Sequence, residues 1–236
     1  MQHLKKNELK PHLSRYWKIP PEDDAAYVAA MEDVLKVYSR PYNSENPVVC
    51  MDESSKQLIG EVRAAIPMTP GESRRIDDEY ERKGVAEIFM AVEPLAGVRT
   101  VQVTERRTRE DWAEFIRYLV DVKYGSCGKI TLVMDNLNTH GIASLYKAFT
   151  PEEASRIADR LEIHYTPKHG SWLNIAEIEL SVYKRQCIAG RIPTFEIMKS
   201  MTEKWNSDRD HAQTRVDWQF TTSDARTKLK RLYPKL

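Results

Sequence analysis

Two short apolar runs in this chain each end in an aspartate, and this pairing is the first sign of chemistry. The run VVCMD closes at Asp52 and the run ITLVMD closes at Asp135. Side chains at the carboxyl ends of strands commonly face the ligand crevice of an open α/β sheet. An aspartate there is unfavourable to bury unless it is paired or binds a cation. Either aspartate alone would indicate a turn, but two of them favour a metal site.

The chemistry that such a site supports depends on a third acid, carried by a predicted helix that includes Glu177. Hard cations such as Mg²⁺ prefer carboxylate oxygens and keep several waters. Two such ions about 3.5–4 Å apart can activate a nucleophile and stabilise a leaving oxygen in phosphoryl transfer. The three acids therefore predict a site for metal-dependent phosphoryl transfer.

The elements that hold these acids follow from the periodicity of the apolar residues. Short runs of strand type are separated by turn residues in the first half of the chain and by helical patterns in the second. The expected strands are 48–52, 57–66, 85–94, 98–105, 129–135 and 161–167. The expected helices are 108–125, a stretch with Pro151 in its middle, 173–189 and 194–207. A meander followed by alternating helices and strands predicts an α/β fold with a mixed sheet covered by helices.

Residues 1–46 differ from the rest of the chain. The first twenty residues carry five Lys and Arg side chains against one acid, Glu8. Pro20 and Pro21 then open a helical pattern with acids in its first turn. We expect a basic arm and a linker helix at 1–46, without a core of its own, and the catalytic domain at 47–236.

Composition excludes several classes of protein. Of the 236 residues 41% are hydrophobic and 30% are charged, which is typical of a globular chain and not of a disordered one. The net charge of +1 gives no indication of nucleic acid, although a basic face can be balanced by an acidic pocket. The three cysteines are far apart and form no C-x-x-C pair, so neither a disulfide framework nor a zinc site is expected. The chain has no signal-peptide or membrane-spanning run, and we expect a cytoplasmic protein.

Several long motifs resemble one known family. VMDNLNTH (133–140) and YTPKHGSWLNIAEIELS (165–181) closely resemble bacterial insertion-sequence transposases of the mariner superfamily, and MDES (51–54), DDEYERKG (77–84), FMAVEPLAG (89–97) and TERRTREDWAEF (104–115) are similar to further signatures of that family. The resemblance covers roughly residues 4–232. It implies an RNase H-like fold with a five-stranded mixed sheet flanked by helices, two Mg²⁺ or Mn²⁺ ions, and DNA as the substrate.

Carried over by position, the catalytic and metal-binding triad of the family is Asp52, Asp135 and Glu177. Glu177 lies five residues after Trp172, where the family places its glutamate. Glu179 is the competing acid, but it lies about 200° further round the helix, so one of the two must point away from the site. Glu53 follows Asp52 directly and should face the other side of its strand, so a metal role for it is not expected.

A second set of polar residues flanks the triad and is expected to contact DNA. Helix N-termini favour phosphate, and basic or amide groups beside them can hold a DNA backbone. The candidates are Asn136, His140, Lys168, His169, Ser171 and Asn174. A turn role for Asn136 and a hydrogen-bonded structural role for His140 are equally consistent with the sequence. Trp172 is expected to be a packing anchor.

The resemblance implies in-line attack at phosphorus, first by water at a transposon end and then by the freed 3′-hydroxyl on target DNA. It also implies a homodimer on DNA, because two transposon ends must be paired, and a place beside the bacterial nucleoid. The family's N-terminal helix-turn-helix region is not recognisable, so the chain is expected to begin within the linker before the catalytic domain. Two alternatives stay open at this stage: an RNase H-like nuclease without strand transfer, and an inactive remnant that only binds DNA.

Overall fold

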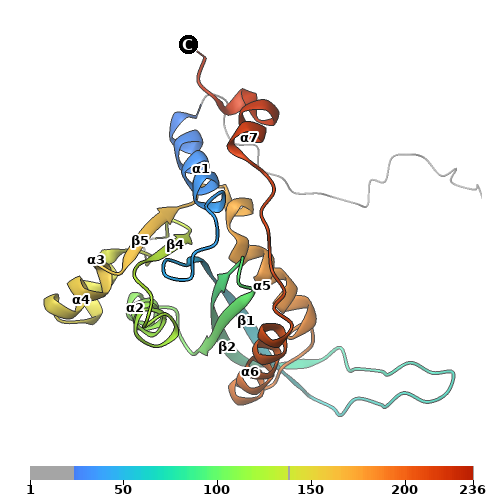
Figure 1. Ribbon diagram of the computed structural model, residues 1–236. Helices are drawn as coiled ribbons and strands as arrows, with labels where there is room; N and C mark the ends of the chain where they lie inside the picture. Colours follow the sequence, from blue (N-terminus) through green and yellow to red (C-terminus); the bar gives the residue numbers. More distant parts are fainter. Residues whose placement is uncertain (1–23, 138, 236) are drawn as a thin grey trace, which may run out of the picture.

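A five-stranded mixed sheet forms the centre of the computed structural model, which describes residues 24–137 and 139–235 (Figure 1). The strands lie in the order β3-β2-β1-β4-β5. Their bounds are β1 Val48–Glu61, β2 Tyr80–Glu93, β3 Val98–Thr104, β4 Ile130–Met134 and β5 Leu161–Tyr165. The first three strands are antiparallel, whereas β1, β4 and β5 run parallel. The predicted mixed sheet is therefore confirmed.

The two strands expected at 48–52 and 57–66 form one continuous strand, β1, so that prediction was wrong. The polar residues between them had indicated a break. β1 instead stays paired with β2 from Cys50, opposite Val92, to Glu61, opposite Tyr80, with one irregularity after Leu58. The backbone hydrogen bonds of a long antiparallel pair do not depend on side-chain polarity, so polar residues on one face do not end the strand. Between the end of β1 and the start of β2, residues 62–79 form an extended hairpin that projects away from the sheet (Figure 1).

Helices cover both faces of the sheet (Figure 1). Their bounds are α1 Ala25–Tyr38, α2 Arg109–Tyr118, α3 Ile142–Ala148, α4 Pro151–Ala158, α5 Ile175–Gln186, α6 Phe195–His211 and α7 Thr222–Lys228. The helix expected around Pro151 is two helices, because Thr150 caps the N-terminus of α4 and proline is tolerated in a first turn, where its missing N–H is not needed. Among the described residues, none of the helices has the length and apolar character needed to cross a membrane.

The alternation of side chains along the strands divides the apolar core into two clusters. Cys50 of β1 and Val133 of β4 belong to a cluster built with α1, α5 and α6. Met51 and Met134 belong to the other cluster, built mainly with α2, α3 and α4. Since successive residues of a strand point to opposite faces, the three central strands β2, β1 and β4 each contribute to both clusters.

The described part of the N-terminal region, α1, packs into the core of the sheet. Met31, Val34 and Leu35 are buried in the same cluster as Leu180 of α5. The basic arm predicted at residues 1–23 lies outside the described residues, and the division of the chain at residue 46 stays a prediction.

A buried ion cluster joins α5, α6 and the start of β3. The Arg99 Nε donates to Glu179 Oε1 at 2.6 Å, and Arg209 Nη2 donates to the same oxygen at 2.7 Å. The Arg99 and Glu179 side chains are almost fully buried. Arg99 also donates to the carbonyl oxygens of Gly97 and Thr214. The cluster therefore fixes how α5 is rotated against the sheet.

Removing one member of this cluster should destabilise the fold strongly. We expect Arg99→Met to lower the free energy of unfolding by about 3–5 kcal/mol, because it leaves a buried carboxylate with too few partners. Urea unfolding followed by circular dichroism measures the change. The double variant Arg99→Met with Glu179→Leu should lose much less than the sum of the two single variants. Strictly additive losses would show that the pair is not coupled.

Candidate functional site

The register of the sheet brings Asp52 and Asp135 together. Cys50 and Val133 are direct partners in the parallel pairing of β1 with β4, and each lies two residues before its aspartate. Residues two apart on a strand share a face, and neighbouring strands lie about 4.8 Å apart. Asp52 therefore points from within β1 to the face that α5 covers, so the prediction that a strand ends at Asp52 was wrong, and Asp135 directly follows the end of β4 beside it.

Burial and the charges of the two other acids of the predicted triad act on the pKa of Asp52. Burial raises this pKa, and the Glu53 backbone N–H opposes the rise by donating to Asp52 Oδ1 at 2.8 Å. The negative charges of Asp135 and Glu177 raise the pKa further, and the net result is about 6. The folded chain thus holds these carboxylates near one another against their repulsion.

Asn174 attaches the N-terminus of α5 to the strand that carries Asp52. Its Oδ1 accepts a hydrogen bond from the Ala176 backbone N–H at 3.1 Å and so caps the helix. Its Nδ2 donates to the carbonyl oxygen of Met51, the residue before Asp52, at 2.9 Å. Asn174 is buried and engaged at both amide atoms, so the prediction that it contacts DNA was wrong. Its role is to position the helix.

Glu177 and Glu179 have different surroundings. Glu177 lies in the first turn of α5, is exposed and acts on Asp52 through its charge. Glu179 is buried and bound by Arg99 and Arg209 on the other side of the helix. This arrangement supports Glu177 as the third acid, because the carboxylate of Glu179 is already neutralised within the protein.

The chemistry of this donor set suits a divalent metal ion. Mg²⁺ and Mn²⁺ favour carboxylate oxygens, and a cation would relieve the repulsion that raises the pKa of Asp52. Within the described residues no three Asp, Glu, His or Cys side chains already converge as a metal-binding group. The argument that a divalent metal ion binds here therefore rests on the carboxylate ligands and on their mutual electrostatic interaction. It does not rest on ligands already arranged around a metal position.

His140 lies between the carboxylates of Asp135 and Glu53. Its Nδ1 is 2.5 Å from Asp135 Oδ1, and its Nε2 is 2.8 Å from Glu53 Oε1. Burial lowers the pKa of His140, but the hydrogen bonds and charges of Asp135 and Glu53 outweigh it and raise the pKa to about 9. The ring is buried and stacks on Trp112, with ring centroids 6.0 Å apart. Both ring nitrogens of His140 are engaged within the protein, which supports the hydrogen-bonded structural role, one of the two roles that the sequence left open.

The other four predicted DNA-contacting residues line one groove beside Asp135. The groove is formed by the loop after β4 and by the loop between β5 and α5, and it contains Asn136, Lys168, His169 and Ser171. All four are exposed. His169 has a φ of 68°, a left-handed conformation that is uncommon for a residue other than glycine. These residues are placed where an extended ligand would pass the acids, and their contact with DNA stays a prediction.

Trp172 packs between α1 and the C-terminal segment, as the packing interpretation expects. Its indole N–H donates to the Tyr27 hydroxyl at 3.0 Å. Its ring stacks on Trp218 with centroids 6.3 Å apart and meets the edge of Phe220. These contacts hold the loop before α5, while Trp172 stays 40% exposed.

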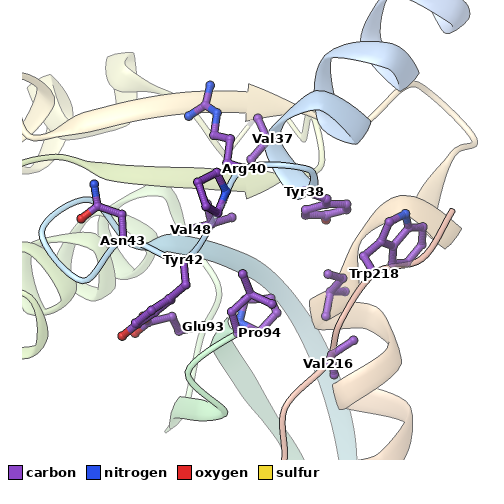
Figure 2. A pocket seen from close by; sticks show the side chains of 13 residues that line it. Val37, Tyr38, Arg40, Tyr42, Asn43, Val48, Glu93, Pro94, Val216 and Trp218 are labelled. Atoms are coloured by element: carbon purple, nitrogen blue, oxygen red, sulfur yellow. The ribbon is translucent and has the colours of Figure 1, made fainter. Parts of the chain in front are cut away.

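A second cavity lies beside the start of β1, near Val48 (Figure 2). Figure 2 shows its apolar wall of Tyr38, Pro94 and Trp218, with Arg40 also at its lining. None of the three acids lines this cavity. Among the described residues, Asp135 is the one of the three acids that lines the groove formed by the loops after β4 and β5.

Comparison with known proteins agrees with this geometry. A family model described as DDE superfamily endonuclease matches residues 47–199. A comparison with curated protein sequences finds no match.

Solved structures of the Mos1 transposase share the fold. The Mos1 mariner paired end complex with Mn matches with a TM-score of 0.54 and 12% identity over 86% of this chain and 63% of that chain. The Mos1 strand transfer complex matches with a TM-score of 0.56 and 11% identity, over 86% of this chain and 62% of that chain. The chain thus spans less than two thirds of these relatives. The likeness confirms the expected RNase H-like fold.

Neutralising Asp52 should stabilise the metal-free fold while removing its response to metal. We expect Asp52→Asn to raise the melting temperature in EDTA at pH 7.5 by about 2–4 °C per kcal/mol of repulsion removed. Mn²⁺ should raise the melting temperature of the wild type and not that of the variant. Differential scanning fluorimetry measures both effects. Asp78→Asn, at an exposed residue on the projecting hairpin, is the matched control. An Asp52→Asn variant that Mn²⁺ still stabilises would contradict the assignment.

Proposed function

Since the chain belongs to the DDE superfamily endonucleases, we propose that it is the catalytic domain of a DNA transposase that cuts transposon ends and joins them to target DNA. The observation that carries this proposal is the groove that Asp135 lines together with Lys168, beside an Asp52 carboxyl group on which the charges of Asp135 and Glu177 act. The groove provides a path for a DNA strand past Asp135. The fold likeness to a structure described as a strand transfer complex supports strand transfer as the second step.

In this proposal Asp52, Asp135 and Glu177 hold two Mg²⁺ or Mn²⁺ ions. When bound, these ions lower the barrier to in-line attack by activating the attacking oxygen and neutralising charge at the phosphate. The protein supplies the positions of the donors: the pairing of β1 with β4 sets the two aspartates, and Asn174 sets the start of α5. Divalent metal use is supported by the family, and by Mos1 structures whose descriptions name Mn and Mg.

Lys168 is the residue best placed to bind the DNA backbone. It is exposed in the groove that also contains Asp135 and Asn136. A lysine in this position can neutralise a phosphate, and the amide of Asn136 can donate to a phosphate or sugar oxygen. We further propose that two copies act together on paired ends, which the Mos1 complexes described as paired end complexes support.

Substitution of Asp135 tests the proposed reaction. We expect Asp135→Asn to reduce Mn²⁺-dependent nicking of supercoiled plasmid by at least about 10³-fold, since the loss of a metal ligand removes several kcal/mol of transition-state stabilisation. Asp159→Asn, at an exposed residue after α4, should keep wild-type activity. Equal nicking by Asp135→Asn and the wild type would exclude this site.

The same assay separates a transposase from a nuclease. Labelled DNA carrying a transposon end is incubated with the plasmid, and covalently joined product is measured on a denaturing gel. The proposal predicts joined product that depends on Asp135. Nicking without any joined product would instead indicate a nuclease that only hydrolyses DNA.

Neutralising Lys168 should weaken DNA binding without affecting metal binding. We expect Lys168→Gln to lower affinity similarly for unrelated DNA sequences and to reduce the salt dependence of binding by about one phosphate contact. Fluorescence anisotropy over a series of salt concentrations measures both quantities. Lys129→Gln is the matched control, because Lys129 is exposed at the opposite end of β4. An unchanged salt dependence in Lys168→Gln would remove Lys168 from the DNA path.

A further inference from the structure

Glu53 is a buried carboxylate that the proposed reaction does not use. Its side chain is about 2% exposed. Glu53 Oε1 lies 2.8 Å from His140 Nε2, whereas Oε2 is buried without a hydrogen-bond partner in the described part of the chain. Arg107 Nε lies 3.6 Å from Oε2 as an ion-pair partner. Burying a carboxylate is unfavourable. We therefore expect the buried side chain of Glu53 to have a structural or functional role.

The backbone pairing of β1 with β4 ends before the two aspartates. Cys50 opposite Val133 is the last pair of that parallel ladder. Beyond this point β1 continues, paired with β2, whereas β4 ends at Met134, and no further pair of the ladder joins the two. Side chains that connect β1 to the segment after β4 therefore contribute to the distance between Asp52 and Asp135.

The His140 ring spans this gap on the face opposite to α5. One ring nitrogen meets Glu53, which follows Asp52 on β1, and the other meets Asp135, which follows β4. Trp112, which is fully buried, stacks on the ring and restricts its tilt. The bridge therefore joins the two strand ends at the level of the acids, and it occupies Oδ1 of Asp135.

We propose that Glu53 and His140 are positioning residues of the metal site, which set the separation of Asp52 and Asp135 and leave Oδ2 of Asp135 for the metal ion. This inference rests on the proposed function. Partners of metal ligands typically change metal affinity by about 10–100-fold when they are replaced. Glu53 and His140 act through Asp135 and need no contact with DNA or metal.

Metal affinity provides the first test on the full chain. We expect Glu53→Leu and His140→Phe each to weaken Mn²⁺ binding, measured by electron paramagnetic resonance, by about 10–100-fold. Glu53→Gln, which keeps an oxygen acceptor for His140, should restore most of the affinity. The double variant of Glu53→Leu with His140→Phe should bind no more weakly than His140→Phe alone, because both break the same bridge.

Glu87→Gln is the matched control for a lost negative charge. Glu87 lies 3.7 Å from the same Arg107 side chain and accepts a hydrogen bond from Ser55. These contacts hold Glu87 to Ser55 and Arg107 and not to the His140 bridge, so its substitution should leave the Mn²⁺ affinity unchanged. If Glu87→Gln weakened binding as much as Glu53→Leu, charge alone would explain the effect and the bridge would be overturned.

Nuclear magnetic resonance of the metal-free chain tests the bridge without activity. The His140 Nδ1 proton facing Asp135 should give a downfield signal in the wild type, absent in His140→Phe. The signal should move in Glu53→Leu and be largely retained in Glu53→Gln. A signal that does not respond to Glu53 would overturn the inference.

The two tests separate this inference from the proposed function. Unchanged Mn²⁺ affinity in Glu53→Leu, with an active wild type, would overturn the positioning role and leave the transposase proposal standing. A wild type that neither binds Mn²⁺ nor cuts DNA would overturn the proposed function, and with it the role of the bridge in metal binding.

Discussion

Electrostatic repulsion between carboxylates is the constraint on which the site depends. The parallel pairing of β1 with β4 carries Asp52 and Asp135 to one face, and α5 adds Glu177. Their proximity, together with burial, raises the pKa of Asp52 to about 6. Such an arrangement is unfavourable in the metal-free chain, so other interactions must hold it. The same repulsion makes the site receptive to divalent cations.

The interactions that hold α5 act from both of its sides. On one side, Asn174 caps the helix and donates to the backbone of β1. On the other side, Glu179 is fixed by Arg99 and Arg209 in a buried ion cluster. A helix fixed in position and rotation presents Glu177 toward the strand ends. The buried cluster far from the groove thereby determines which glutamate can take part in the chemistry.

The groove beside Asp135 relates the charges of the acids to the kind of substrate that the chain can bind. Asp135 lines an open groove bounded by the loops after β4 and β5, whereas none of the three acids lines the apolar cavity near Val48. An open groove admits a long substrate that is held mainly along its backbone. The fold is shared with Mos1 transposase structures at 11–12% identity, so the arrangement of the sheet persists where most side chains differ.

The mixed sheet and the membership of the DDE endonuclease family could be predicted from the sequence, because both depend on local patterns and contiguous motifs, and the same motifs supplied the three acids as a hypothesis. The sequence did not predict that residues 48–61 form one strand or that a second helix begins at Pro151. The roles of His140 and Asn174 were also decided only by the tertiary structure. His140 meets Glu53, 87 residues away, and Asn174 meets Met51, 123 residues away. A polar side chain can bind water, DNA or protein equally well, and only the folded chain determines which partner is within reach and whether water is excluded.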